Sequence, residues 1–152
     1  MAMSGRPTPT EDVEQAHLFQ WAAWAECEYP ELRWMHHIPN GGKRSKAEAA
    51  RFKGMGVKAG VPDIFLPVRM MRYDFGQGLS YAGLYIELKR ETNGRVSREQ
   101  DVWITGLREQ GYACEVCHGW QEARAVIERY LRGTYVPVYM PPSRRPKKEQ
   151  KE

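Results

Sequence analysis

The sequence has few cysteines and no apolar stretch of membrane-spanning length. None of its apolar runs approaches the roughly 18–20 residues that a spanning helix requires. Residues 1–10 carry one arginine without an apolar segment after it, which argues against a secretory signal. Three cysteines cannot all pair with one another, so we expect free thiols, a reducing cytoplasm and no membrane association.

The absence of disulfides does not prevent folding, because the chain has 152 residues. A domain of that size buries roughly 68–70% of its unfolded surface and needs no cross-links. The composition, 41% hydrophobic and 28% charged, is that of one globular domain. We predict a leader over residues 1–9, a domain over residues 10–136, and a basic tail rich in proline and lysine over residues 137–152.

Charge is unevenly distributed along the chain, although the net charge is only 23 − 19 = +4. Residues 1–31 carry one cation against six acids, whereas residues 40–60 carry six cations against one acid. The tail adds five cations and two acids. Such basic blocks favour a polyanionic partner, most plausibly nucleic acid, although solvated surface lysines are an equally ordinary explanation of charge alone.

Local patterns predict alternating helices and strands. Helices are expected to start at the capping residues Thr10, Ser45 and Ser97, and a closing helix is expected over residues 120–132. Strands are expected over residues 32–38, 61–68, 84–89 and 112–117, with residues 69–82 as an extended excursion. This order predicts an α/β fold in which helices flank a central sheet.

The segment 84–89 (LYIELK) alternates, so that Glu87 and Lys89 share one face of a strand, roughly 6–7 Å apart. One strand earlier, Asp63 follows Pro62 in an apolar segment, where a lone acid is costly without a cationic partner. If the two strands are neighbours, Asp63 and Glu87 converge at one end of the sheet. For either motif alone, a surface ion pair or a turn aspartate is the more common explanation.

Two such carboxylates would repel each other unless a divalent cation lay between them. Oxygen ligands of this kind select Mg²⁺ or Mn²⁺ over Zn²⁺. The ion would polarise a phosphate and lower the pKa of a water molecule. Lys89 would then orient that water or neutralise the charge that develops at phosphorus. The pattern thus favours metal-dependent hydrolysis of a phosphodiester.

Taken together, the residues PD at 62–63, ELK at 87–89, Ser97 and Gln100 resemble the PD-(D/E)xK nucleases, specifically the VRR-NUC (virus-type replication-repair nuclease) branch. Residues 38–44, 56–60 and 111–112 are also similar to segments of that branch. The resemblance implies a restriction-endonuclease-like core with a mixed central sheet. It also implies Mg²⁺-dependent hydrolysis of DNA, with Mn²⁺ as a possible substitute.

The resemblance further implies a biological setting. Stand-alone members from phages and bacteria are associated with homodimers that act in DNA repair on branched DNA such as Holliday junctions. We therefore expect a DNA endonuclease in the cytoplasm of a bacterial or phage-infected cell. The alternative is a module that binds branched DNA on a nuclease scaffold without cutting it.

By the same resemblance, the metal ligands would be Asp63, Glu87 and the backbone carbonyl of Leu88. Lys89 matches the motif lysine, and Gln100 matches a glutamine expected near the scissile phosphate or the lysine. A further acid comes from the first helix, where the spacing of Glu11 to Gln15 fits the family pattern better than Glu14 does. Either glutamate could instead simply complement the helix dipole.

The glycine-rich turn after the first strand is the candidate DNA contact. Its backbone amides can approach a phosphate while neighbouring cations contact the strand, unless it is a simple turn. The predicted DNA-binding residues are Asn40, Gly41, Gly42, Lys43, Arg44, Lys46 and Lys58.

Residues 114–118 spell CxxCH, the pattern of covalent haem attachment. That chemistry requires export to an oxidising compartment, and the segment also fits a strand in which the two cysteines point to opposite faces. We therefore expect buried thiols there and no haem.

Overall fold

The computed structural model describes residues 7–40, 44–74 and 77–142 of the chain. Helices and strands follow one another as α1 (Glu11–Ala25), η1 (Pro30–Trp34), β1 (His36–His37), α2 (Lys46–Gly54), β2 (Ile64–Leu66), β3 (Met70–Asp74), β4 (Gln77–Tyr81), β5 (Leu84–Lys89), α3 (Arg98–Glu109), β6 (Ala113–His118) and α4 (Trp120–Leu131). Nowhere in these ranges is there a helix long and apolar enough to cross a membrane.

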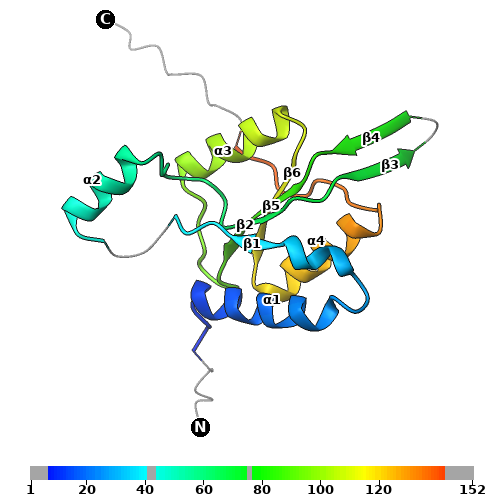
Figure 1. Cartoon of the computed structure of the whole chain (residues 1–152), viewed down its shortest axis with the longest axis horizontal. Coiled ribbons are helices and arrows are strands. Elements are labelled where there is room, and N and C mark those ends of the chain that lie inside the picture. The colour runs from blue at the N-terminus through cyan, green and yellow to red at the C-terminus, as the bar shows by residue number, and fades with distance from the viewer. Residues whose placement is uncertain (1–6, 41–43, 75–76, 143–152) are drawn as a thin grey trace, which may run out of the picture.

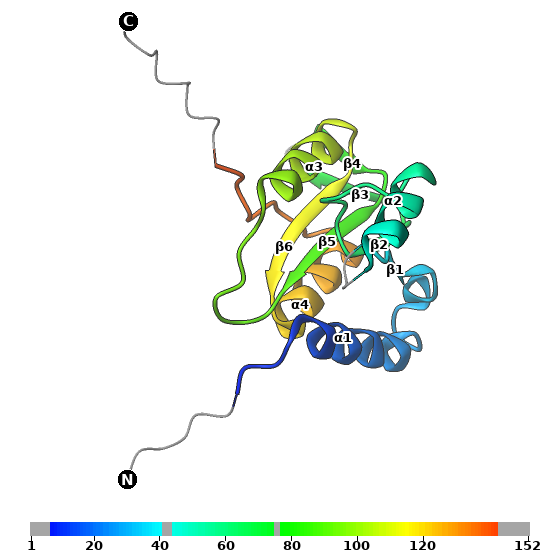
Figure 2. The same ribbon diagram turned by 90° about the vertical axis from the view of Figure 1, so that its left-hand side faces the viewer.

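The central sheet has the strand order β1-β2-β5-β6. β5 and β6 are parallel, whereas β1–β2 and β2–β5 are antiparallel, so the sheet is mixed as predicted. Helices α1 and α4 cover one face and α3 covers the other (Figure 1; Figure 2). Strands β3 and β4 form a separate hairpin that projects from this body (Figure 1).

Three helices begin where the sequence predicts. The side chains of Thr10, Ser45 and Ser97 each accept a hydrogen bond from the backbone amide three residues later, which satisfies one of the free amides at the helix start. At α3 the capping box is complete, because the Gln100 side chain also accepts from the Ser97 backbone amide at 2.7 Å.

Other boundaries differ from the sequence predictions. The expected strand 32–38 is a 3₁₀ turn followed by a strand of only two residues, because Pro30 opens η1 at a position that suits proline. The expected strand 61–68 is only the three residues of β2. The excursion 69–82 is the β3–β4 hairpin.

The core consists of two clusters on opposite faces of the sheet. Leu84, Ile86 and Leu88 of β5 belong to the cluster under α1 and α4, whereas Tyr85 packs against the cluster under α3. The alternation predicted for residues 84–89 is thus confirmed. The apolar side of α1 is narrower than its sequence indicates, because Trp24 is 81% exposed.

A buried carboxylate on β6 ties the C-terminal strap (residues 135–139) to the body. Glu115 is 1% exposed and accepts hydrogen bonds from the Tyr135 hydroxyl at 2.7 Å and from the amides of Val138 and Tyr139 at 2.9 Å. Arg108 Nη2 lies 3.2 Å from the same carboxylate. The strap therefore packs on the domain beyond Val136, where the sequence predicts the start of a tail.

Side chains also cover the outer edge of β6. Arg108 donates to the Cys114 carbonyl from Nε at 3.1 Å and from Nη2 at 2.7 Å, and from Nη1 to the Tyr139 carbonyl at 2.7 Å. At the other end of the strand, the His118 amide donates to Glu122 Oε2 at 2.6 Å. Two backbone groups that a terminal strand would leave open, the Cys114 carbonyl and the His118 amide, are therefore partnered within the chain.

Candidate active site

Asp63 and Glu87 meet at one end of the sheet. In the antiparallel register Ile64 lies opposite Ile86, so Asp63, one residue earlier, lies beside Glu87 and on the same face. Asp63 Oδ2 accepts a hydrogen bond from the Leu88 amide at 2.9 Å, which fixes this carboxylate against β5. The two acids therefore occupy neighbouring strands and face the same space.

The two oxygens of Glu87 have different environments. Oε1 accepts from Gln100 Nε2 at 2.5 Å and lies 3.0 Å from Lys89 Nζ. Oε2 is fully buried, and no donor among the described residues reaches it. A buried carboxylate oxygen without a donor is costly in a protein interior, so this atom is available for a cation.

Burial and charge together favour the protonated form of Glu87. Loss of solvation raises its pKa from 4.5 to about 8, and the nearby charge of Asp63 adds to the effect, while Lys89 opposes it. A carboxyl group with this pKa binds a proton at neutral pH when no cation is present. Binding a cation would therefore displace that proton.

The cation-free protein is expected to lose stability as the pH rises from 4.5 to about 8. The Glu87 pKa is about 8 in the folded state and 4.5 in the unfolded chain, so between these pH values the folded chain holds a proton that the unfolded chain has lost. This contribution to the free energy of unfolding is fully present below pH 4.5. It then falls by on the order of 1 kcal/mol per pH unit and is gone above about pH 8. Urea unfolding in EDTA at several pH values measures it, and Glu87→Gln should remove this component. An identical pH dependence in both proteins would contradict the assignment.

The capping box at α3 also orients Gln100. Because Gln100 Oε1 accepts from the Ser97 amide, its Nε2 group must point the other way, toward Glu87. The chain before Asp63 packs tightly on this same turn: a Cβ atom on Gly60 would lie 2.6 Å from the Glu99 backbone carbon, and the φ angle of Gly60 is +90°. A glycine at this position thus sets the spacing between Asp63 and Gln100.

The structure separates the two candidate acids of α1. Glu11 Oε1 lies 4.0 Å from Lys89 Nζ, at the rim of the site. Glu14 is 1% exposed, and its Oε2 accepts from the Trp120 amide at 2.9 Å. Glu14 therefore caps α4, whose own N-cap residue is the glycine Gly119.

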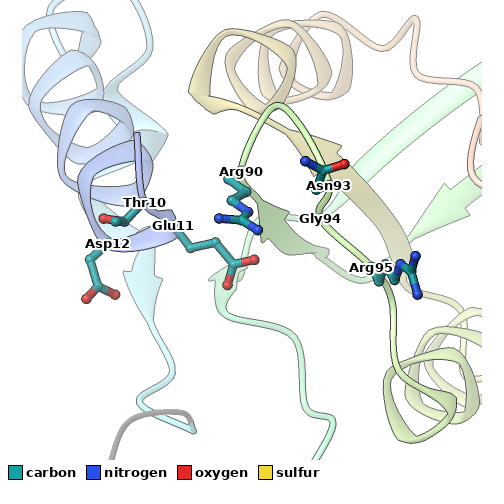
Figure 3. Close-up of a pocket in the computed structure, with 7 residues that line it drawn as sticks. All are labelled: Thr10, Glu11, Asp12, Arg90, Asn93, Gly94 and Arg95. Atoms are coloured by element: carbon teal, nitrogen blue, oxygen red, sulfur yellow. The ribbon is translucent and has the colours of Figure 1, made fainter. Parts of the chain in front are cut away.

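A pocket of about 420 Å³ opens beside this site (Figure 3). The first turn of α1, with Glu11 and Asp12, forms one wall, and the loop after β5, with Arg90 and Arg95, forms the other. Gly94 packs against Lys89, since a Cβ atom on it would lie 2.7 Å from Lys89 Cβ. The loop therefore presents two exposed arginines next to Lys89.

The predicted DNA-binding residues that the structure describes lie on and around α2. Asn40 donates to the Val61 carbonyl at 3.2 Å, and the Arg44 guanidinium lies over the Phe52 ring. Lys46 and Lys58 are exposed. Gly41, Gly42 and Lys43 lie outside the described residues.

Four exposed cations of α2 and the β5–α3 loop are absent from the sequence-based prediction: Arg51, Lys53, Arg90 and Arg95. The dense cations of residues 43–58 were a signal for the first two. No sequence pattern indicated the arginines of the β5–α3 loop, because only the fold places them in the same pocket as Glu11.

The CxxCH cysteines are free and buried, as expected. Cys114 belongs to the cluster under α3 and Cys117 to the cluster under α1 and α4, so they point to opposite faces of the sheet. Burial raises the pKa of the Cys114 thiol to about 12. Neither thiol contributes to the site formed by Asp63 and Glu87.

Comparisons with known proteins agree with this geometry. The family model described as "VRR-NUC domain" matches residues 10–121. A solved structure described as "VRR_NUC domain protein" is 29% identical, covers 91% of this chain and 98% of its own, and superposes with a TM-score of 0.64. A search among curated proteins finds no significant match. The fold is thus the nuclease-like α/β fold implied by the sequence motifs, and the chain belongs to the VRR-NUC family of nuclease-type, DNA-processing domains.

Proposed function

We propose that this protein is a Mg²⁺-dependent DNA endonuclease that hydrolyses phosphodiester bonds in branched DNA such as Holliday junctions. The observation that carries the proposal is the buried Oε2 atom of Glu87, which has no donor among the described residues and lies beside Asp63. Two converging carboxylates with a free buried oxygen suit a hard cation, with Mn²⁺ as a substitute for Mg²⁺.

The ligands would be Asp63, Glu87 and the carbonyl of Leu88. No three His, Cys, Asp or Glu side chains of the described ranges form a metal-binding group, so other oxygens, from the backbone or from water, would complete the set. The Leu88 amide points at Asp63, and in an extended strand the carbonyl of a residue points to the same side as its amide. The Leu88 carbonyl therefore faces the space that Asp63 and Glu87 share.

Lys89 and Gln100 would assist this pair of acids. A bound Mg²⁺ supplies Lewis-acid polarisation of the phosphate and a lowered pKa of water. Lys89, whose Nζ is 3.0 Å from Glu87 Oε1, places a buried positive charge where the phosphate becomes more negative. Gln100 holds Glu87 Oε1, which leaves Oε2 for the cation. Glu11 would add an acid at the rim.

The charge around the site supports DNA as the substrate. Exposed cations belong to α2 and to the β5–α3 loop. Both lie on the side of the molecule where α1 and α3 begin (Figure 1). Phosphate contacts of this kind supply much of the affinity for DNA. The branched substrate and the homodimer follow from likeness to stand-alone family members, and the three free thiols are consistent with a reducing cytoplasm.

A cleavage panel tests the proposal. Labelled four-way junction, flap, duplex and single strand of matched sequence are incubated with the protein in Mg²⁺, Mn²⁺ or EDTA. We expect product from the junction with either metal, less from the duplex, and none in EDTA. Tight binding of the junction with no product under any divalent ion would instead support the non-catalytic binding module. Equal cutting of all four substrates would overturn the branched-DNA assignment.

A further inference from the structure

Helix α2 contributes nothing to either core cluster. None of its side chains is buried, and only Phe52 is even half-buried. A free helix of nine residues is marginal in water, so its persistence must depend on contacts outside the core. Figure 1 shows α2 standing away from the sheet.

A pocket of about 590 Å³ lies between α2 and the segment that leads to β2. Its lining includes the cations Arg44, Lys53 and Lys58 and no acidic side chain. The volume falls in the range of pockets that hold ligands of roughly nucleotide size. The unbalanced positive charge selects an anion.

One wall of this pocket is flat. The Arg44 guanidinium carbon lies 4.3 Å from the centroid of the Phe52 ring. Stacked arginine and aromatic groups are surfaces on which nucleobases stack, and stacking of this kind requires an unpaired base. A base pair inside a duplex cannot offer its face to such a wall.

The pocket is close to the proposed metal ligands. Its lining ends at Ala59, four residues before Asp63, which is at most about 14 Å of extended chain. Asn40, which also lines the pocket, is hydrogen-bonded to the Val61 carbonyl between them. At 3.4 Å per nucleotide of B-form strand, the gap corresponds to at most about four nucleotides.

We propose that this pocket binds an unpaired nucleotide of the DNA substrate, a few positions from the cleavage site. The base stacks on Phe52 and Arg44, and Lys53 and Lys58 hold the adjoining phosphates. The inference rests on the proposed nuclease function and gives a physical reason for a preference for branched DNA, because base pairs at a branch point open more readily than base pairs inside a duplex arm. Binding also gives α2 the contacts that it lacks in the core.

The test compares single-stranded and duplex DNA in EDTA, so that binding is measured without cleavage. Phe52→Ala is expected to weaken binding of a single strand about 10-fold, since base–aromatic stacking contributes to single-strand affinity, and to change duplex binding less than twofold. Phe52→Leu, which keeps an apolar side chain but no flat ring, should show most of the same loss. A 2-aminopurine base in the strand should be quenched by the parent protein and brighter with either variant.

Arg51→Ala is the matched control, because Arg51 is exposed on the same helix outside the pocket lining. It should weaken both DNA forms alike and leave their ratio unchanged. Equal losses of single-strand and duplex binding in Phe52→Leu would overturn the proposal, as would undiminished quenching. These binding results stand apart from the cleavage panel: a protein that cuts no DNA but shows the selective loss would retain the pocket and lose the nuclease function.

Discussion

Glu87→Gln is expected to lower Mg²⁺-dependent cleavage about 10³-fold while DNA binding in EDTA stays close to that of the parent. A metal ion contributes several kcal/mol to stabilising the transition state, and a tenfold change in rate corresponds to about 1.4 kcal/mol. The amide keeps the shape of the side chain but removes the charge that a hard cation requires. Single-turnover cleavage of the preferred substrate at saturating protein measures the loss.

The stability of the same variant separates chemistry from folding. Because burial already favours the neutral form of Glu87, the amide should leave the cation-free unfolding temperature unchanged or higher at pH 8. Glu109→Gln, at an exposed position at the far end of α3, is the control and should cleave like the parent. Parent-like cleavage by Glu87→Gln would remove Glu87 from the site.

The second large effect concerns stability. Glu115→Ala is expected to lower the free energy of unfolding by about 3–5 kcal/mol, because it removes the acceptor of three hydrogen bonds from the strap and leaves the half-buried Arg108 without its carboxylate partner. For a chain of this length, that change lowers the melting temperature by roughly 10 °C. Differential scanning calorimetry and urea titration measure it.

Glu115→Gln is the matched control for this prediction. The amide oxygen can still accept from Tyr135 or Val138, so the loss should be clearly smaller than for alanine. A melting temperature of Glu115→Ala within about 2 °C of the parent would show that the strap is held by other contacts. Cleavage at low temperature should survive in both variants, because Glu115 contacts none of the proposed ligands.

The elements that sequence analysis located best are those fixed by local patterns. The alternation of residues 84–89 corresponds to β5, and the capping residue Ser97 corresponds to the start of α3, because both patterns act within a few residues. The segment 69–82 was predicted only as an extended excursion, because an apolar residue such as Leu79, which is exposed in β4, does not mark a buried face. The prediction of a strand over residues 32–38 was wrong in its first half, because Pro30 favours a helix start and residues 30–34 form η1 despite the apolar residues there.

The residues of the candidate site also divide into those that sequence motifs indicate and those that only the fold brings together. The sequence motifs indicate Asp63, Glu87 and Lys89 as partners, and the register of β2 and β5 brings them together. The cap that Glu14 provides for α4 joins residues 106 positions apart, which no local pattern encodes. The placement of Arg90 and Arg95 across from α1 likewise depends on how the helix packs on the sheet.

The covered edge of β6 has a consequence for assembly. A second copy that added a strand along β6 would compete with the Arg108 guanidinium for the Cys114 carbonyl and with the Glu122 carboxylate for the His118 amide. This competition disfavours pairing through β6, and it favours a twofold-symmetric complex formed through helices or the projecting hairpin. The separation and relative direction of the two cleavage centres would then depend on side-chain packing between subunits, which point substitutions can alter without disturbing either sheet.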